Sequence, residues 1–224
     1  MFIGHYGFAL AVKKYRPKIS LGLLFIAVQF MDVLFSLFVL LGIEKMRIIP
    51  GFTAYNPYDL YFMPFTHSLL GAVIWSTVFS FILLISVWWT DPNRKLYATA
   101  VAMAVFSHFL LDLPMHTADL PLSFSEGSEK IGFGLWNYKW LSLLAELSVF
   151  QIGVFLYLKS TKTFPGRNRF FASIFFSAMT ILLFATPFLP SPVSPQAFAF
   201  QALTTYLGLA LVADWIGRTR HSVT

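Results

Sequence analysis

Long apolar segments without a single basic side chain are the feature that most limits how this chain can fold. Six such segments, separated by polar, proline-containing or basic residues, are found in the 224-residue sequence. A helix needs about 20 apolar residues to cross the roughly 30 Å hydrocarbon layer of a bilayer, and the segments approach that length. We therefore predict an all-α polytopic membrane protein, a bundle of about six transmembrane helices at residues 19–43, 65–89, 96–113, 140–158, 170–190 and 196–216.

The first twelve residues are apolar but too short to span the bilayer, and the basic cluster follows them instead of preceding them. This order argues against a secretion signal. We expect a short half-helix that lies in the interface or dips into the bundle and carries His5. The connections are short and no repeat is evident, so residues 1–224 are predicted to form one integral membrane domain. Within it, residues 1–158 hold the polar residues of interest, and residues 159–224 add two spans.

Basic residues are distributed unevenly between the two predicted sides of the membrane. With the N-terminus inside, the inner segments hold twelve of the sixteen Lys and Arg residues, and the outer loops hold Lys45, Arg47, Lys130 and Lys139. Positive charge is retained on the cytoplasmic side, which predicts a bacterial inner-membrane protein with both termini in the cytoplasm. The net charge of +6 then reflects topology and contact with anionic lipid, and nucleic acid is not an expected partner. The oligomeric state does not follow from the sequence.

Apart from Asp214, which can pair with Arg218 four residues later, five ionisable residues fall inside or at the edge of the predicted spans: Asp32, His67, His108, Asp112 and Glu146. A carboxylate at the bilayer centre costs about 2.5–3.5 kcal/mol on insertion scales. Because no span offers a Lys or Arg, compensation must come from protonation, a charged histidine, water or a bound cation. The helical rise places all five in the middle-to-outer half of the membrane. We predict that they converge on one polar site, the alternative being scattered structural use.

The stretch SHFLLDLPMH, residues 107–116, has the spacing of a metal-binding helix face. His108 and Asp112 are four residues apart, so both project from one face and can bind one metal or pair with each other. Pro114 ends or kinks the helix, which allows His116 and Asp119 to turn back toward the same place. Since the chain has no cysteine, a set of histidines and carboxylates suits zinc, with manganese or iron as alternatives.

Three segments resemble a bacterial family of predicted membrane-bound metal-dependent hydrolases. These are FIGHYGFALAVKK near the N-terminus, PFTHSLLGAV and SHFLLDLPMH. Members carry an N-terminal histidine, an aspartate in the first span, a Thr-His-Ser element and a His-x-x-x-Asp element. TADLPL and GFGLWN, followed by Glu146, are similar to later segments in a branch of this family, so the resemblance covers roughly residues 1–158. More distantly, the order of these residues is similar to that of bacterial zinc-dependent phospholipases C.

Residue by residue, the resemblance implies metal ligands and a base. The implied ligands are His5, Asp32, His67, His108 and Asp112, with His116 and Glu146 as further ligands or a general base. The phospholipases begin their mature chain at a ligating tryptophan and have more histidines after the His-x-x-x-Asp element. This chain departs from both features, so we expect one or two metal ions.

The predicted function is a membrane-embedded metal-dependent hydrolase that acts from the outer face on an ester or phosphodiester. A metal-bound water would attack the substrate, and Glu146 or Asp119 would accept its proton. Membrane lipid is an expected partner and a lipid or lipid-linked phosphoester the natural substrate class, although a small-molecule substrate stays open. Two alternatives lack this catalysis: an ion-coupled transporter that uses the same buried acids and histidines, and a structural membrane subunit, with or without haem on two histidines.

Overall fold

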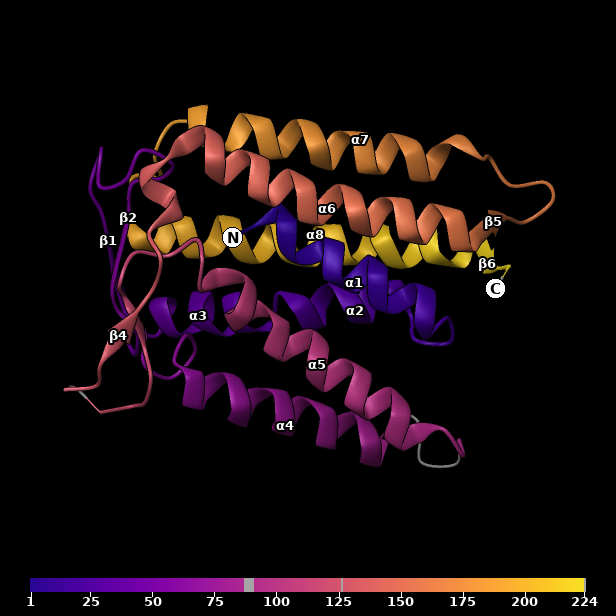
Figure 1. Cartoon of the computed structure of the whole chain (residues 1–224), viewed down its shortest axis with the longest axis horizontal. Helices are drawn as coiled ribbons and strands as arrows, with labels where there is room; N and C mark the ends of the chain where they lie inside the picture. The colour runs from indigo at the N-terminus through magenta and orange to yellow at the C-terminus, as the bar shows by residue number, and fades with distance from the viewer. Residues whose placement is uncertain (87–90, 126, 224) are drawn as a thin grey trace.

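The computed structural model describes residues 1–86, 91–125 and 127–223, in which helices run mainly along one long axis and short strands lie at the ends (Figure 1). The α-helices are α1 (Ile3–Tyr15), α2 (Leu21–Val28), α3 (Phe30–Leu40), α4 (Leu69–Ser86), α5 (Arg94–Asp112), α6 (Lys139–Ser160), α7 (Phe170–Ala185) and α8 (Pro195–Arg218). Two 3-10 helices are η1 (Leu135–Asn137) and η2 (Thr186–Phe188). The antiparallel strand pairs are β1 (Lys45–Ile48) with β2 (Tyr58–Phe62), β3 (Leu120–Pro121) with β4 (Lys130–Ile131), and β5 (Thr161–Thr163) with β6 (Arg220–Ser222). The all-α prediction is confirmed.

The number of spans differs from the prediction. Among the described residues, three helices are long and apolar enough to cross a membrane: α6, α7 continued by η2, and α8. The pair α2 and α3 makes a fourth if its two arms, bent by 58°, count as one span. Six spans is therefore wrong. The apolar part of α4 is too short, and residues 87–90 at the end of that predicted span lie outside the described residues. Helix α5 begins with two basic residues and carries a histidine and an aspartate, so it is less apolar.

Helix α1 enters the interior of the bundle. Its 13 residues span about 20 Å, so it is the short helix expected from the sequence. It packs chiefly against α6 and also contacts α2 and α5. The α1 and α6 backbones touch at Gly7 and Gly153, where a Cβ on either glycine would collide with main-chain atoms of the other helix. Small residues of this kind allow two helix backbones to approach closely.

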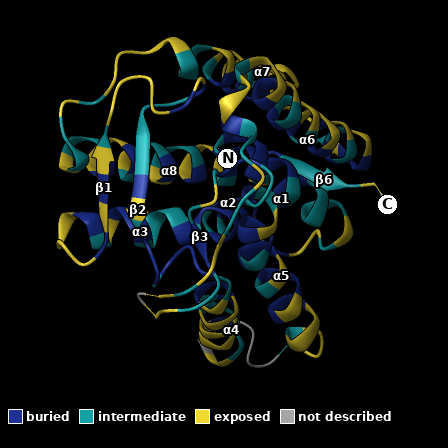
Figure 2. Cartoon of the chain, turned by 60° about the vertical axis from the view of Figure 1, so that its left-hand side comes forward, coloured by how far each residue is buried: buried dark blue, intermediate teal, exposed yellow. Residues whose placement is uncertain are grey.

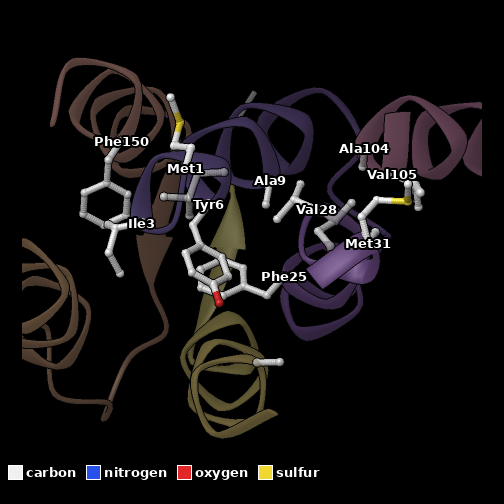
Figure 3. Close-up of a cluster of buried hydrophobic side chains, with 14 of the residues drawn as sticks. Met1, Ile3, Tyr6, Ala9, Phe25, Val28, Met31, Ala104, Val105 and Phe150 are labelled. Atoms are coloured by element: carbon white, nitrogen blue, oxygen red, sulfur yellow. The ribbon is translucent and has the colours of Figure 1, made fainter. Parts of the chain in front are cut away.

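The apolar core surrounds α1, and the exposed apolar surface lies on the outer helices. Figure 3 shows the ring of Tyr6 lying against Phe25, with centroids 4.5 Å apart. In Figure 2, exposed residues follow the outer faces of α4, α6 and α7, and buried residues gather around α1 and α2. Large apolar side chains are exposed on those outer faces, including Phe81, Phe155 and Ile181. A surface that faces lipid exposes apolar side chains, because contact between these side chains and hydrocarbon is favourable, whereas their exposure to water is not.

A break at Gln29 separates α2 from α3. Ser20 caps α2 by accepting a hydrogen bond from the Leu23 amide at 3.1 Å, and α2 ends at Val28. Helix α3 begins again at Phe30, so Asp32 lies in its first turn. The positive end of a helix dipole favours a carboxylate there. The break thus gives Asp32 a favourable position inside the bundle.

The two ends of the bundle differ in charge and structure. The end of α1, the start of α5, and strands β5 and β6 gather at one end, and this end carries most of the basic residues (Figure 1). Hairpin β1–β2, strand β4 and the start of α6 lie at the other end. The amino group of Met1 is not at the basic end, because it lies buried beside Asp112.

Candidate metal centre

Helix α5 and the turn after it supply three of the predicted residues. His108 Nε2 lies 3.0 Å from Asp112 Oδ2, as their spacing on one helix face predicts. The helix ends at Asp112, whose carbonyl accepts the amides of Met115 and His116, both at 2.9 Å. This tight turn brings His116 back toward the helix, with its Nε2 3.5 Å from Asp112 Oδ2. The chain therefore turns back at His116, and the helix ends at Asp112, two residues before Pro114.

Asp32 and His67 approach the same carboxylate from other parts of the chain. His67 lies just before α4, and its Nε2 is 3.2 Å from Asp32 Oδ1 and 3.9 Å from Asp112 Oδ2. His108 Nε2 is 3.5 Å from Asp32 Oδ1. The structure thus brings together residues that are far apart in the sequence, and His67 and His108 are almost fully buried.

Three imidazoles are oriented by a partner on their Nδ1 atom. His108 Nδ1 donates to the Val28 carbonyl at 2.7 Å, and His116 Nδ1 donates to Asp119 Oδ1 at 2.9 Å. His67 Nδ1 lies 2.8 Å from Thr66 Oγ1. In each case Nε2 is left to face the carboxylates of Asp32 or Asp112. An outer partner on one ring nitrogen is what fixes the tautomer of a metal-binding histidine.

The separations between ligand atoms suit a metal ion. Two groups, His5–His108–Asp112 and Asp32–His67–His108, each place one ligand atom per residue within 4.8 Å of the others. Metal–ligand bonds near 2.0–2.2 Å put neighbouring tetrahedral ligand atoms about 3.3 Å apart. The separations between imidazole nitrogens and the oxygens of Asp112 and Asp32 lie between 3.0 and 3.9 Å. These buried groups could therefore hold a metal ion, whose identity the geometry does not select.

His5 joins the site from α1. Its ring stacks on that of His108, with centroids 3.9 Å apart and planes 9° apart. His5 Nε2 lies 3.2 Å from Asp112 Oδ1, the carboxylate oxygen opposite the one that faces His108. The amino group of Met1 also contacts Asp112 Oδ1. The two oxygens of Asp112 therefore face two different groups of nitrogen atoms.

Glu146 has a different set of partners from the other acids. Its Oε2 accepts the amides of Phe2 at 3.0 Å and Gly4 at 3.2 Å, and its Oε1 accepts the Tyr55 hydroxyl at 3.0 Å. Glu146 is fully buried and sits at the N-terminus of α1, where free amides and the helix dipole favour a carboxylate. Glu146 thus lies beside the other acids in the cavity lining, and its hydrogen bonds connect α6 to the start of α1.

Asp119, the other predicted base, forms a hydrogen bond with His116. Its Oδ1 accepts the His116 Nδ1 hydrogen, and its Oδ2 accepts the Thr117 hydroxyl at 3.1 Å. Among the described residues it is not part of the cavity wall. This geometry places Asp119 behind His116, away from the cavity.

A cavity of about 580 Å³ lies over these residues. Its polar floor includes Asp32, His67, Asp112, His116 and Glu146. Its walls come from the 50–58 loop, the end of α7, the 187–192 segment and the start of α8. Several wall residues are apolar, among them Phe198, Leu182 and Leu189. The volume and mixed lining are typical of sites for small ligands.

Carboxylates outnumber the ammonium groups in the described lining of this cavity. The ammonium groups are the Met1 amino group, which pairs with Asp112, and Lys139, whose Nζ lies 5.0 Å from the Phe188 ring. Three carboxylates line the same cavity. A cation among the acids would relieve their mutual repulsion and desolvation, as the sequence predicted for a set without Lys or Arg partners.

Three residues of the site were missed by the sequence reasoning. Tyr206 in α8 donates to Asp32 Oδ2 at 3.2 Å, although the last two helices carried no specific signal. Tyr55 donates to Glu146, and Glu44 is buried behind Thr66. Burial raises the pKa of Glu44 from its ordinary value of 4.5 to about 7, against hydrogen bonds from Thr66 and Phe65. A buried acid in a loop rich in aromatic residues leaves no local pattern that could have identified it.

No family model, no curated protein and no solved structure matches the chain. The family resemblance and the reaction that it implies therefore remain predictions. The structure shows how the residues that the sequence predicts for the site are arranged in space.

Proposed function

We propose that this chain is a membrane-embedded metal-dependent hydrolase that cleaves an ester or phosphodiester. The observation that carries the proposal is the orientation of three buried imidazoles, His67, His108 and His116, of which His67 and His116 line the cavity. Each has its Nδ1 atom engaged by a protein partner and its Nε2 atom directed at Asp32 or Asp112. With Nδ1 engaged, each Nε2 can face a carboxylate favourably if it carries a proton or if it shares a bound cation with that carboxylate, and one cation serves several of these pairs at once.

A divalent ion held by these ligands supplies Lewis acidity and lowers the pKa of a bound water toward neutrality. The donor set of imidazole and carboxylate, without thiolate, suits zinc, manganese or iron. His67, His108, His116, Asp32 and Asp112 would hold the ion, and His5 would add a nitrogen on the other oxygen of Asp112. His5 therefore extends the site toward a second ion.

Glu146 is the better placed of the two proposed bases. It lines the cavity, whereas Asp119 lies behind His116. Among the described residues its Oε1 atom has one hydrogen-bond donor, the Tyr55 hydroxyl, so a second lone pair remains to accept a proton. We assign Glu146 the general-base role and Asp119 the orientation of His116.

The proposed substrate is lipid-linked, and the protein lies in the bacterial inner membrane with its basic end in the cytoplasm. The 187–192 segment supports this assignment, because its Leu189 lines the cavity and because Phe188, Leu189 and the following Val193 expose apolar side chains. We assign this apolar segment to the bilayer interface. A substrate with an apolar tail would pass from the lipid into the cavity without crossing water.

Ion-coupled transport is the second candidate, favoured by the break between α2 and α3. A broken helix that places a carboxylate inside a bundle is a feature of secondary transporters. Transport also requires access from both sides of the membrane. The cavity wall is built from residues at the end of the bundle opposite the basic one, which favours the hydrolase.

The test is metal analysis of purified protein, followed by hydrolysis of phospholipids and of a chromogenic phosphodiester. The variants are Asp112→Asn and His108→Ala, with Asp214→Asn as a matched control, because Asp214 forms an exposed ion pair with Arg218 at 2.8 Å. We expect stoichiometric metal and turnover in wild type and Asp214→Asn, and loss of both in the site variants. A folded wild-type protein that binds no added zinc, manganese or iron would overturn the proposal. Metal binding with no turnover on any substrate would leave a metal-stabilised subunit and reject the hydrolase.

A further inference from the structure

Glu44 is a buried acid that neither lines the cavity nor pairs with a base. It follows α3 and precedes β1, and it is 1% exposed. Within the described residues, no Lys or Arg forms an ion pair with it. Burying a carboxylate in this way is costly unless its oxygens are well used. The question is therefore what this acid does.

Within the part of the chain that the structure describes, the hydrogen bonds of the Glu44 carboxylate all go to the segment that carries His67. Oε1 accepts the amides of Phe65 at 2.8 Å and Thr66 at 2.9 Å. Oε2 accepts the hydroxyl of Thr66 at 2.6 Å. The carboxylate thus spans the turn that precedes α4 and holds the Thr66 side chain in one orientation.

The direction of these bonds determines the state of His67. A hydroxyl has one hydrogen, and Thr66 gives it to the carboxylate, which can only accept when ionised. The Thr66 oxygen is then an acceptor toward His67 Nδ1, which lies 2.8 Å away. His67 Nδ1 must carry a hydrogen to complete the bond. The other nitrogen, Nε2, keeps its lone pair free, and it faces Asp32 Oδ1 at 3.2 Å.

We propose that Glu44 is a positioning residue that, acting through the Thr66 hydroxyl, keeps a proton on His67 Nδ1 and so presents His67 Nε2 to a metal ion. This inference deepens the proposed function, because it assigns a role in the same site. It concerns the tautomer of one histidine, so it can be tested whether or not the protein hydrolyses anything. An outer partner of this kind changes metal affinity about 10- to 100-fold when it is removed.

Glu44→Gln is the most informative variant. Glutamine keeps the shape of the side chain, but its amide group reverses the direction of the hydrogen bonds from residue 44 through Thr66 to His67. The amide oxygen must take the place of Oε1, since the two backbone amides there are donors and would repel an NH₂ group. The NH₂ group then faces the Thr66 oxygen and donates to it. The Thr66 hydroxyl has then lost its acceptor at residue 44, which favours donation of its hydrogen to His67 Nδ1 and leaves that nitrogen without a proton. Nε2 is then protonated and cannot bind a metal in that state.

The experiment is ¹⁵N NMR of histidine-labelled protein at pH 8, with and without zinc. Five histidines give few signals, and pH 8 lies above the pKa of Glu44. We expect a protonated Nδ1 on His67 in wild type and an unprotonated one in Glu44→Gln, with about 10- to 100-fold weaker zinc binding. His108 and His116, whose Nδ1 partners are Val28 and Asp119, should keep their tautomers and serve as internal controls.

Two variants at Thr66 separate the relay from a general loss of structure. Thr66→Ser keeps the hydroxyl and should retain the wild-type tautomer and zinc affinity. Thr66→Val removes the hydroxyl at similar volume, and His67 should lose its fixed tautomer even if Glu44→Gln does not fold. The proposal is overturned if His67 keeps its Nδ1 proton in Glu44→Gln or its fixed tautomer in Thr66→Val. If the His67 tautomer responds to both variants as expected but wild type binds no zinc, the role of Glu44 stands and the metal site is rejected.

Discussion

His108 in α5 donates a hydrogen bond from Nδ1 to the carbonyl of Val28, the last residue of α2, across 2.7 Å. This contact ties the helix that carries the His-x-x-x-Asp element to the break that introduces Asp32. It also directs Nε2 of His108 toward Asp32 and Asp112, at 3.5 and 3.0 Å. The break in the first apolar segment is therefore part of the site, because it supplies both an acid and the group that orients a histidine.

Metal addition is expected to stabilise the folded protein. A ligand that binds the native state but not the unfolded chain raises stability in proportion to the logarithm of its concentration, by about 2.7 kcal/mol at 100 times Kd. Thermal unfolding in detergent, followed after EDTA treatment and after zinc addition, measures this effect. Zinc should raise the Tm of wild type and of Asp214→Asn but leave that of Asp112→Asn unchanged. Equal shifts in all three proteins would place the bound zinc elsewhere.

Asp119→Asn should weaken metal binding without changing the fold. The amide oxygen can still accept the His116 Nδ1 hydrogen, so the ring orientation is kept. A neutral acceptor makes the imidazole a poorer ligand than a carboxylate does, and we expect about a tenfold loss of zinc affinity. Calorimetric titration with zinc measures this loss. The proposed positioning role of Asp119 is rejected if affinity is unchanged while His116→Ala reduces it.

Tyr206→Phe removes one hydrogen bond to Asp32 and no apolar surface. The lost bond, 3.2 Å long, is worth about 1–3 kcal/mol because its partner is charged and buried. Thermal unfolding of the metal-free protein should show a lower Tm. The contact contributes nothing measurable if the Tm of the variant equals that of wild type, and α8 would then have no energetic link to the site.

Gly7→Ala is expected to lower the free energy of unfolding by about 1–3 kcal/mol or more, because the added methyl group would collide with the Val149 carbonyl in α6. Gly208→Ala is the matched control, since a Cβ there meets nothing within 4 Å. Replacing a helical glycine by alanine in open space should be neutral or stabilising by up to about 1 kcal/mol. Chemical or thermal unfolding of both variants measures the difference. Similar stabilities would mean that α1 and α6 can separate at no cost.

Stability should fall as the pH rises from 5 to 8, and part of the fall should come from Glu44. The unfolded chain releases this proton near the ordinary pKa of 4.5, whereas burial keeps it bound in the folded protein up to a pKa of about 7. Between these values the unfolded state binds fewer protons, so the free energy of unfolding decreases with pH. A shift of this size corresponds to at most about 3 kcal/mol. The Tm of wild type should drop more between pH 5 and pH 8 than that of Glu44→Gln. Parallel pH profiles would contradict the raised pKa.

The sequence by itself determined the helical class, the apolar surface and the central pair of the site. His108 and Asp112 meet because four residues make about one helical turn, which is a local property of the chain. The absence of Lys and Arg from the predicted spans likewise led to the prediction that the buried acids and histidines share one polar site. The number of spans was wrong, because apolar composition does not show where a helix begins, breaks or ends short of the bilayer thickness.

Only the tertiary structure decided which other residues reach that pair and what each one does there. His5 enters because α1 packs between α6 and α2, and Tyr206 reaches Asp32 across 174 residues of sequence. Glu146 anchors the start of α1, and Glu44 meets Thr66 from a loop that has no periodic pattern. Contacts of this range depend on how helices pack and on which polar atoms remain to be satisfied once they have packed. Helix packing and the polar atoms that it leaves without partners depend on the whole bundle. A local stretch of sequence therefore does not determine them.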